Sequence, residues 1–247
     1  SAWRSTPTLL RPPTTTPTHL SCGRLSPARV RPDLPNFPDP TGHGLPLSTH
    51  TSDVVVIGAG INGASCAWHL ASRGLSVTVV ERESAPAVGS TGKSAAGVRV
   101  QFTTAANIKL SLYSLPVYRE FLERYGYEIG YKAIGYLLLV PHERWGDHLA
   151  SVALQKSLGA PVEVFDPVEA QRFIPFETDG LAGATYGPWD GVIDPHMVTH
   201  AWVAMGKGLG VDYRMNCPID TIERRSHRWV LRSGEETFEC GHVVNAA

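Results

Sequence analysis

The sequence is poor in cysteine, in long apolar runs and in net charge. Its four cysteines lie far apart with no C-x-x-C spacing: Cys22, Cys66, Cys217 and Cys240. This spacing argues against a disulfide framework and against a zinc knuckle, and it favours a reducing compartment. No apolar run approaches the roughly 20 residues that a membrane-spanning helix needs. Lysine plus arginine number 22 and aspartate plus glutamate 23, so charge gives no indication of a nucleic acid or anionic membrane as partner.

The 247 residues are enough for a substantial core, but proline and arginine are unevenly distributed. Residues 1–50 hold ten of the 19 prolines and five arginines against two aspartates. Such a segment buries too little apolar area to offset its ordering entropy, so we predict that it is disordered. We expect a cytoplasmic protein. The alternative is a mitochondrial one, because an arginine-rich, acid-poor leader resembles a transit peptide.

Regular structure is predicted to begin at Thr51. The apolar run Val54–Ile57 is typical of a buried parallel strand, and it leads directly into a G-x-G-x-x-G pattern. A helix over Ala64–Arg73 and a second strand over Leu75–Val80 should follow, with Glu81 at the end of that strand. Strand, glycine turn, helix and a following acid together indicate a dinucleotide-binding unit.

The chemistry of dinucleotide binding explains this spacing. Gly58 allows the tight turn, Gly60 lets the backbone approach a pyrophosphate, and Gly63 lets helix and strand pack closely. Free N–H groups at the helix start hold the pyrophosphate, and Glu81 accepts hydrogen bonds from the adenosine ribose. The predicted turn consists of Gly58, Ala59, Gly60, Ile61, Asn62 and Gly63.

The segment Ala87–Ser94 also matches a relaxed nucleoside-triphosphate loop, with alanine in place of the first glycine. A loop of that kind should leave the first strand of its domain and enter a helix directly. Here Arg82–Ala87 intervenes after the strand, and the residues after Ser94 lack a helical pattern. We therefore interpret it as a loop that wraps a flavin.

Several stretches now resemble one family. DVVVIGAGINGAS…VTVVERE, GSTGKSAAGVRVQF, GYLLLV, GATYGPWDGVIDPHMV and the final VVNAA follow the motif order of the D-amino-acid oxidase-like flavoproteins. Within that family the sequence is most similar to the sarcosine oxidase and dimethylglycine dehydrogenase branch. The resemblance implies an α/β fold for the FAD-binding domain and, together with an antiparallel-sheet domain, an α+β fold overall. A discontinuous Rossmann-like FAD-binding domain would span 52–128 and 195–247, and 129–194 would form part of an antiparallel-sheet substrate domain.

The resemblance also implies FAD as the cofactor. Arg82 would lie beside the adenosine, and Ser90, Thr91 and Ser94 near the phosphates and flavin ring. Ile219 would lie on a strand that faces the adenine. Relatives that attach FAD through a histidine carry it at about Lys93, so non-covalent binding is expected. Relatives that attach it through a cysteine carry that cysteine beyond Ala247, so this route stays open.

Arg99 falls where monomeric sarcosine oxidases place an arginine that binds the substrate carboxylate. A guanidinium can hold a planar carboxylate with two hydrogen bonds. The alternative is a surface arginine on a Val98–Val100 strand, paired with an acid. We expect no metal at His196 and His200, which lack a third ligand. Asp190 in the pair Trp189-Asp190 has two interpretations. It is either a charged group beside the substrate or a loop aspartate next to a core tryptophan, and we favour the second.

The remaining periodicity predicts helices over Asn107–Tyr125, Glu143–Leu158 and Asp194–Leu209. Pro116 should kink or split the first of them, and Asp166-Pro167 should begin another helix. Strands are predicted over Tyr131–Val140, Tyr213–Glu223, Arg228–Leu231 and Phe238–Val244.

By resemblance, the reaction is oxidation of the C–N bond of a small amine or amino acid. The substrate carbon gives a hydride equivalent to the flavin and leaves an imine that water hydrolyses. No catalytic acid or base is identifiable. The alternatives are a non-catalytic flavin-binding or assembly protein of the same family, and an NAD-linked dehydrogenase. The partners considered are the small amine or amino-acid substrate and, in an oligomer, partner subunits. The family continues beyond Ala247, so 247 residues alone are expected not to close the FAD site.

Overall fold

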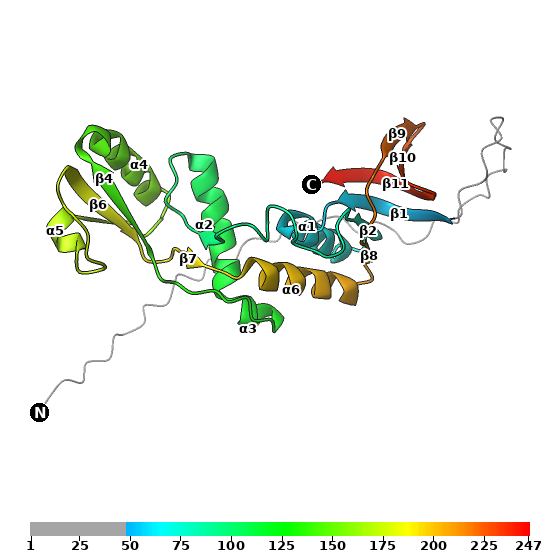
Figure 1. The fold of residues 1–247 in the computed structure, drawn as a ribbon, viewed down its shortest axis with the longest axis horizontal. Helices are drawn as coiled ribbons and strands as arrows, with labels where there is room; N and C mark the ends of the chain where they lie inside the picture. Colours follow the sequence, from blue (N-terminus) through cyan, green and yellow to red (C-terminus); the bar gives the residue numbers. More distant parts are fainter. Residues whose placement is uncertain (1–47) are drawn as a thin grey trace, which may run out of the picture. The chain divides into compact units, whose positions relative to one another are not determined.

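The computed structural model describes residues 48–247 (Figure 1), and most of the segment predicted to be disordered lies outside this range. A six-stranded sheet has the strand order β8-β2-β1-β11-β10-β9. The strands β8, β2, β1 and β11 run parallel, and β10 and β9 continue antiparallel. The sheet consists of β1 (Ser48–Ile57), β2 (Val77–Val80), β8 (Asp212–Arg214), β9 (Thr221–Arg225), β10 (Arg228–Ser233) and β11 (Glu236–Asn245). Strands far apart in sequence thus share one sheet.

Both faces of β1 are buried, as its apolar run predicted. Val54 and Val56 pack with Ala67 of α1 (Ile61–Ala71), whereas Val55 packs with Phe238 on the other face. Helix α6 (Pro195–Gly208) packs against α1, and Trp202 is nearly inaccessible within a group of aromatic rings. These contacts fix the end of β1 relative to the start of α1.

The chain between β2 and α6 forms two small antiparallel sheets. The first pairs β3 (Gly97–Val98) with β7 (Gly191–Val192), and the second has the order β4-β6-β5. The strands of this second sheet are β4 (Tyr136–Pro141), β5 (Glu163–Phe165) and β6 (Leu181–Gly187). The helices are α2 (Ala105–Arg119), α3 (Phe121–Tyr125), η1 (His142–Arg144), α4 (Trp145–Ser157) and α5 (Pro167–Ala170). The fold class of the prediction is confirmed, while its domain boundaries stay predictions.

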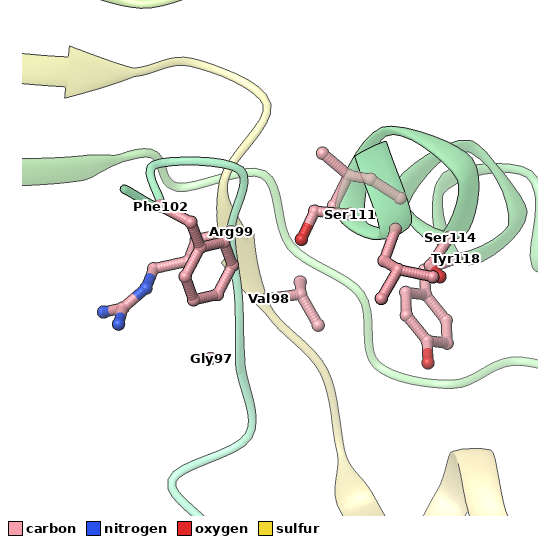
Figure 2. A pocket seen from close by; sticks show the side chains of 9 residues that line it. Gly97, Val98, Arg99, Phe102, Ser111, Ser114 and Tyr118 are labelled. Atoms are coloured by element: carbon pink, nitrogen blue, oxygen red, sulfur yellow. The ribbon is translucent and has the colours of Figure 1, made fainter. Parts of the chain in front are cut away.

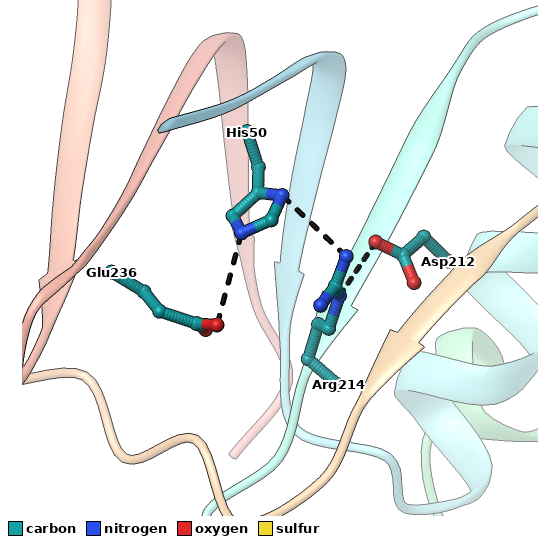
Figure 3. Close-up of polar contacts among 4 residues, drawn as sticks. All are labelled: His50, Asp212, Arg214 and Glu236. Atoms are coloured by element: carbon teal, nitrogen blue, oxygen red, sulfur yellow. Dashed lines mark hydrogen bonds and ion pairs between the residues drawn. The ribbon is translucent and has the colours of Figure 1, made fainter. Parts of the chain in front are cut away.

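Strand β1 begins at Ser48, six residues before the predicted strand and three before Thr51, where regular structure was predicted to begin. Ser48–His50, placed in the disordered segment by composition, pairs with Glu236–Phe238 of β11. The His50 ring stacks on Phe238, with ring centroids 5.0 Å apart, and its Nε2 lies 3.8 Å from a Glu236 carboxylate oxygen. Arg214 bonds Asp212 at 2.8 Å and approaches His50 Nδ1 at 3.5 Å (Figure 3). Ser48–His50 are thus ordered by pairing with a distant strand, although their composition predicted disorder.

Two of the predicted strands are interrupted. The strand over Tyr213–Glu223 is wrong between β8 and β9, because Asn216 has a φ of 54° and Pro218 follows it. Ile219 thus lies in a loop rather than on a strand. The strand over Tyr131–Val140 begins only at Tyr136, after Gly135 with a φ of 74°. The helix over Asn107–Tyr125 is split at Glu120 into α2 and α3, while Pro116 lies inside α2, four residues before the break.

Candidate functional site

The glycine turn after β1 has the geometry that its pattern predicted. Gly58 has a φ of 99°, and its N–H donates to the Val80 carbonyl at 2.8 Å. A Cβ at Gly63 would overlap the carbonyl oxygen of Gly58, which is backbone and cannot move aside easily. Glycine is therefore required where the start of α1 passes over the end of β1.

Glu81 holds the other side of this turn. Its Oε2 accepts from the Ala59 N–H at 2.6 Å, and its Oε1 accepts from the Glu83 N–H at 3.0 Å. Each carboxylate oxygen keeps a further lone pair, which suits the two adjacent hydroxyls of a ribose. The carboxylate is thus fixed in place by the backbone before any ligand arrives.

The loop after β2 closes over the glycine turn at two points. The Ala87 N–H donates to the Ala59 carbonyl at 3.2 Å, and Thr91 Oγ1 accepts from the Ile61 N–H at 3.1 Å. Residues 86–93 form turns, and β3 rather than a helix follows Ser94. This order contradicts the interpretation of Ala87–Ser94 as a nucleoside-triphosphate loop, because such a loop should lead directly into a helix.

A cleft of about 630 Å³ lies between the turn and this loop. Of the predicted cofactor residues it is lined by Gly58, Gly60, Ile61, Asn62, Glu81, Arg82, Ser90, Thr91 and Ile219. Ala59 and Gly63 lie buried behind it, and Ser94 lies outside it, where its hydroxyl accepts from the Ala96 N–H at 2.9 Å. The cleft is also lined by residues that the sequence interpretation did not assign to the cofactor: Ile57, Val80, Glu83, Ala87, Gly89, Cys217, Pro218, Ala246 and Ala247. The quoted VVNAA motif was the available signal for the last two.

Arg99 lies away from this cleft. It lines a separate pocket of about 230 Å³ between β3 and α2 (Figure 2). Its guanidinium lies over the Phe102 ring, 5.1 Å from the centroid, and is exposed. No ion pair of Arg99 is found among residues 48–247, so the paired surface arginine of the alternative interpretation is not observed. Its role in substrate binding stays a prediction.

The remaining candidates have structural surroundings. His196 and His200 are exposed on α6, and no group of three metal-binding side chains occurs in the described part of the chain. Asp190 is fully buried, whereas Trp189 is only half-buried, so the interpretation of this pair stays a prediction. None of the helices between residues 48 and 247 combines the length and apolar character that crossing a bilayer requires.

The family assignment comes from a comparison of the whole chain with family models. The model described as DAO, FAD dependent oxidoreductase, matches residues 53–247. The chain belongs to this family. The predictions of family and of FAD as cofactor are thereby confirmed, and the match favours FAD over the NAD-linked alternative.

Individual relatives agree with this assignment. A FAD-dependent oxidoreductase domain-containing protein 1 from Xenopus laevis is 30% identical over 83% of this chain and 43% of its own length. The mitochondrial dimethylglycine dehydrogenase of Homo sapiens is 28% identical over 82% of this chain and 24% of its own. A crystal structure of L-proline dehydrogenase from P. horikoshii superposes with a TM-score of 0.75 at 28% identity, over 81% of this chain and 54% of that one. The chain thus spans less than half of the two curated relatives.

The cleft residues fit the adenosine-diphosphate half of FAD. A Cβ at Gly60 would lie 3.0 Å from Thr91 Oγ1 and would fill the cradle between loop and turn. The Asn62 and Gly63 N–H groups of the α1 start have no acceptor among the described residues. Such N–H groups, with the positive end of the helix dipole, suit a pyrophosphate, and Glu81 suits a ribose. The cleft therefore combines the donor and acceptor groups that this half of the cofactor needs.

The two backbone hydrogen bonds of Glu81 make a direct prediction. Glu81→Gln places an amide donor against one of two backbone donors, so we expect about 10-fold weaker FAD binding and a loss of about 1–2 kcal/mol in unfolding free energy. Fluorescence titration of FAD and thermal unfolding measure both. Glu177→Gln is the matched control, because that glutamate is exposed and lies outside the cleft. Equal effects of the two substitutions would refute the role of Glu81.

Proposed function

We propose that the protein is an FAD-dependent oxidoreductase that oxidises the C–N bond of a small, sarcosine-like amine or amino acid. The observation that carries this proposal is the cleft of the glycine turn, Glu81 and the 87–91 loop, which has the groups for adenosine diphosphate within a chain of this family. FAD, when bound, supplies the acceptor for the hydride equivalent. Relatives named as dehydrogenases of dimethylglycine and of L-proline support a C–N bond as the target.

The residues of this chain have separate tasks in the proposed function. The α1 start and Glu81 hold the cofactor, with Arg82, Ser90, Thr91 and Ile219 along the same cleft. Arg99 binds the substrate carboxylate by its guanidinium. Orientation of the substrate then supplies much of the rate enhancement, because the chemistry belongs to the cofactor.

Anaerobic flavin reduction tests the proposal. The purified chain with saturating FAD is mixed with sarcosine, dimethylglycine or proline, and the flavin absorbance is followed without oxygen. Bleaching with saturation in substrate is the expected result. Absence of bleaching with every amine, although FAD binds, would instead support the non-catalytic flavin-binding alternative. Reoxidation by oxygen compared with that by an electron-accepting dye then separates oxidase from dehydrogenase.

Location and subunit partners also belong to the proposal. We keep the cytoplasm as the proposed location and mitochondria as the alternative, because one relative is named as mitochondrial. Fluorescence microscopy of the tagged protein, with and without residues 1–47, which precede β1, decides between the two. Partner subunits stay a prediction.

A further inference from the structure

The imidazole ring of His196 packs against the loop of residues 87–93, which closes one side of the cofactor cleft. Thr91 of this loop lines the cleft. Its neighbour Gly92 has no room for a side chain, because a Cβ there would overlap the carbonyl oxygen of Ala87 and would lie 2.7 Å from Cε1 and 3.0 Å from Nε2 of His196. Gly92 is thus enclosed between the other arm of its own loop and a ring from α6.

The start of α6 fixes the place of this ring. Asp194 caps the helix, and its Oδ1 accepts from the His196 N–H at 2.9 Å. The Ile193 N–H, directly before the cap, donates to the Ala96 carbonyl at 3.1 Å. Helix α6 also lies beside α1 and packs against it (Figure 1). The ring of His196 therefore reaches the loop from a helix that is anchored to α1, whose own start faces the cleft.

The 87–93 loop depends on contacts that hold it against the cleft. Two hydrogen bonds, made by Ala87 and Thr91, join it to the glycine turn. Ala87 has a φ of 65°, a conformation that a residue with a side chain rarely adopts. Strained segments persist only where their surroundings hold them, and loops with few contacts open at a low cost in free energy. The ring of His196 supplies such a contact from outside the loop.

We propose that His196 is a positioning residue of the cofactor site, whose ring keeps the 87–93 loop closed over bound FAD. This role requires the cofactor cleft and is independent of the proposed oxidation of an amine. Neither ring nitrogen of His196 forms a hydrogen bond within residues 48–247, so the ring acts on Gly92 by packing. Without the ring, Gly92 is free to move outward, and the adjoining Thr91 leaves the cleft wall with it. FAD then dissociates faster, while the rest of the fold keeps its contacts.

Trypsin cleavage after Lys93 measures how often the loop opens, because this lysine is exposed within it. His196→Ala should raise the initial rate of this cleavage about 10-fold, and saturating FAD should slow the cleavage in the wild type. His196→Phe keeps an aromatic ring and should restore the rate to within about threefold of the wild type. His200→Ala is the matched control, because it removes the same exposed side chain one turn further along α6, and it should change nothing. Mass spectrometry of the cleaved peptides gives the rates.

Release of FAD after dilution, followed by its fluorescence, measures the effect on the cofactor. His196→Ala should release FAD about 10-fold faster, and its melting temperature without FAD should stay within about 2 °C of the wild type. Unchanged cleavage after Lys93 in this variant would overturn the role of His196, and so would FAD that fails to slow the wild-type cleavage. Faster cleavage without faster FAD release, or a His196→Phe variant that behaves like His196→Ala, would also overturn it. The expected effects without any anaerobic flavin reduction would support the role of His196 and contradict only the proposed oxidation.

Discussion

Replacement of Gly63 by alanine should nearly abolish FAD binding. The new Cβ overlaps the Gly58 carbonyl, so either α1 moves away from β1 or the turn changes its shape. Both movements displace the N–H groups that face the cleft. We expect an unfolding free energy about 2–3 kcal/mol lower, as for overpacked cores, and FAD binding weakened roughly 100-fold. Chemical denaturation and FAD fluorescence titration measure the two effects.

Gly146→Ala provides the control for this substitution. Gly146 lies in α4, and a Cβ there meets no atom within 4 Å. Alanine favours helix over glycine by about 1 kcal/mol, so this variant should be equal to or more stable than the wild type and should bind FAD equally. A Gly63→Ala variant that binds FAD like Gly146→Ala would show that the close passage of α1 over β1 does not shape the site.

The second large effect is expected at Asp190. Removal of its side chain in Asp190→Ala leaves the buried Val100 N–H and one Gln101 donor without their acceptor. A loss of about 3 kcal/mol in unfolding free energy should follow. Asp179→Ala is the control, because that aspartate is exposed, and its change should lie within about 0.5 kcal/mol. A small effect at Asp190 would contradict the rigid mounting of the Arg99 segment.

The charge of Asp190 adds a dependence on pH. Burial raises the pKa of this carboxyl above its ordinary value, more than its hydrogen bonds from Gln101 and Val100 and the nearby Arg99 charge lower it. The folded state therefore holds this proton more tightly than the unfolded state. The resulting stability is complete below the unfolded pKa of about 3.9 and is lost as pH rises through the raised folded pKa. The stability of the wild type relative to Asp190→Asn should thus decrease from pH 4 upward. A constant difference would indicate that Asp190 has an ordinary pKa.

The features that the sequence predicted correctly depend on local pattern. The glycine turn, Glu81 and the Asp-Pro helix starts each arise within a few residues of one another, and the structure has them as expected. Helix α5 even forms the capping box between Asp166 and Glu169. Fold class followed from the same local signals and from the family resemblance.

The features that the sequence missed depend on contacts between distant segments. Ser48–His50 joins a strand only because β11 lies beside it, nearly 190 positions further along the chain. Ala246 lines the cleft because its N–H donates to the Ile57 carbonyl at 2.9 Å. The contact of Tyr136 with Gly97 likewise joins two strands that the local pattern cannot bring together. The sequence shows a glycine at position 97, but the requirement for glycine there comes from the phenol of Tyr136, 39 positions further along the chain.

Competition between nucleotides for the cleft tests the central claim most directly. The claim is that the glycine turn, Glu81 and the 87–91 loop bind the adenosine-diphosphate half of FAD. The sequence led us to expect that this chain does not close the FAD site, but the cleft already offers the groups for adenosine diphosphate. Titration of the purified chain should therefore show one saturable FAD site from which ADP displaces FAD, whereas FMN, which lacks the adenosine, should not compete. Saturable FAD binding that FMN displaces and ADP does not, or binding unchanged by Gly63→Ala, would contradict the account.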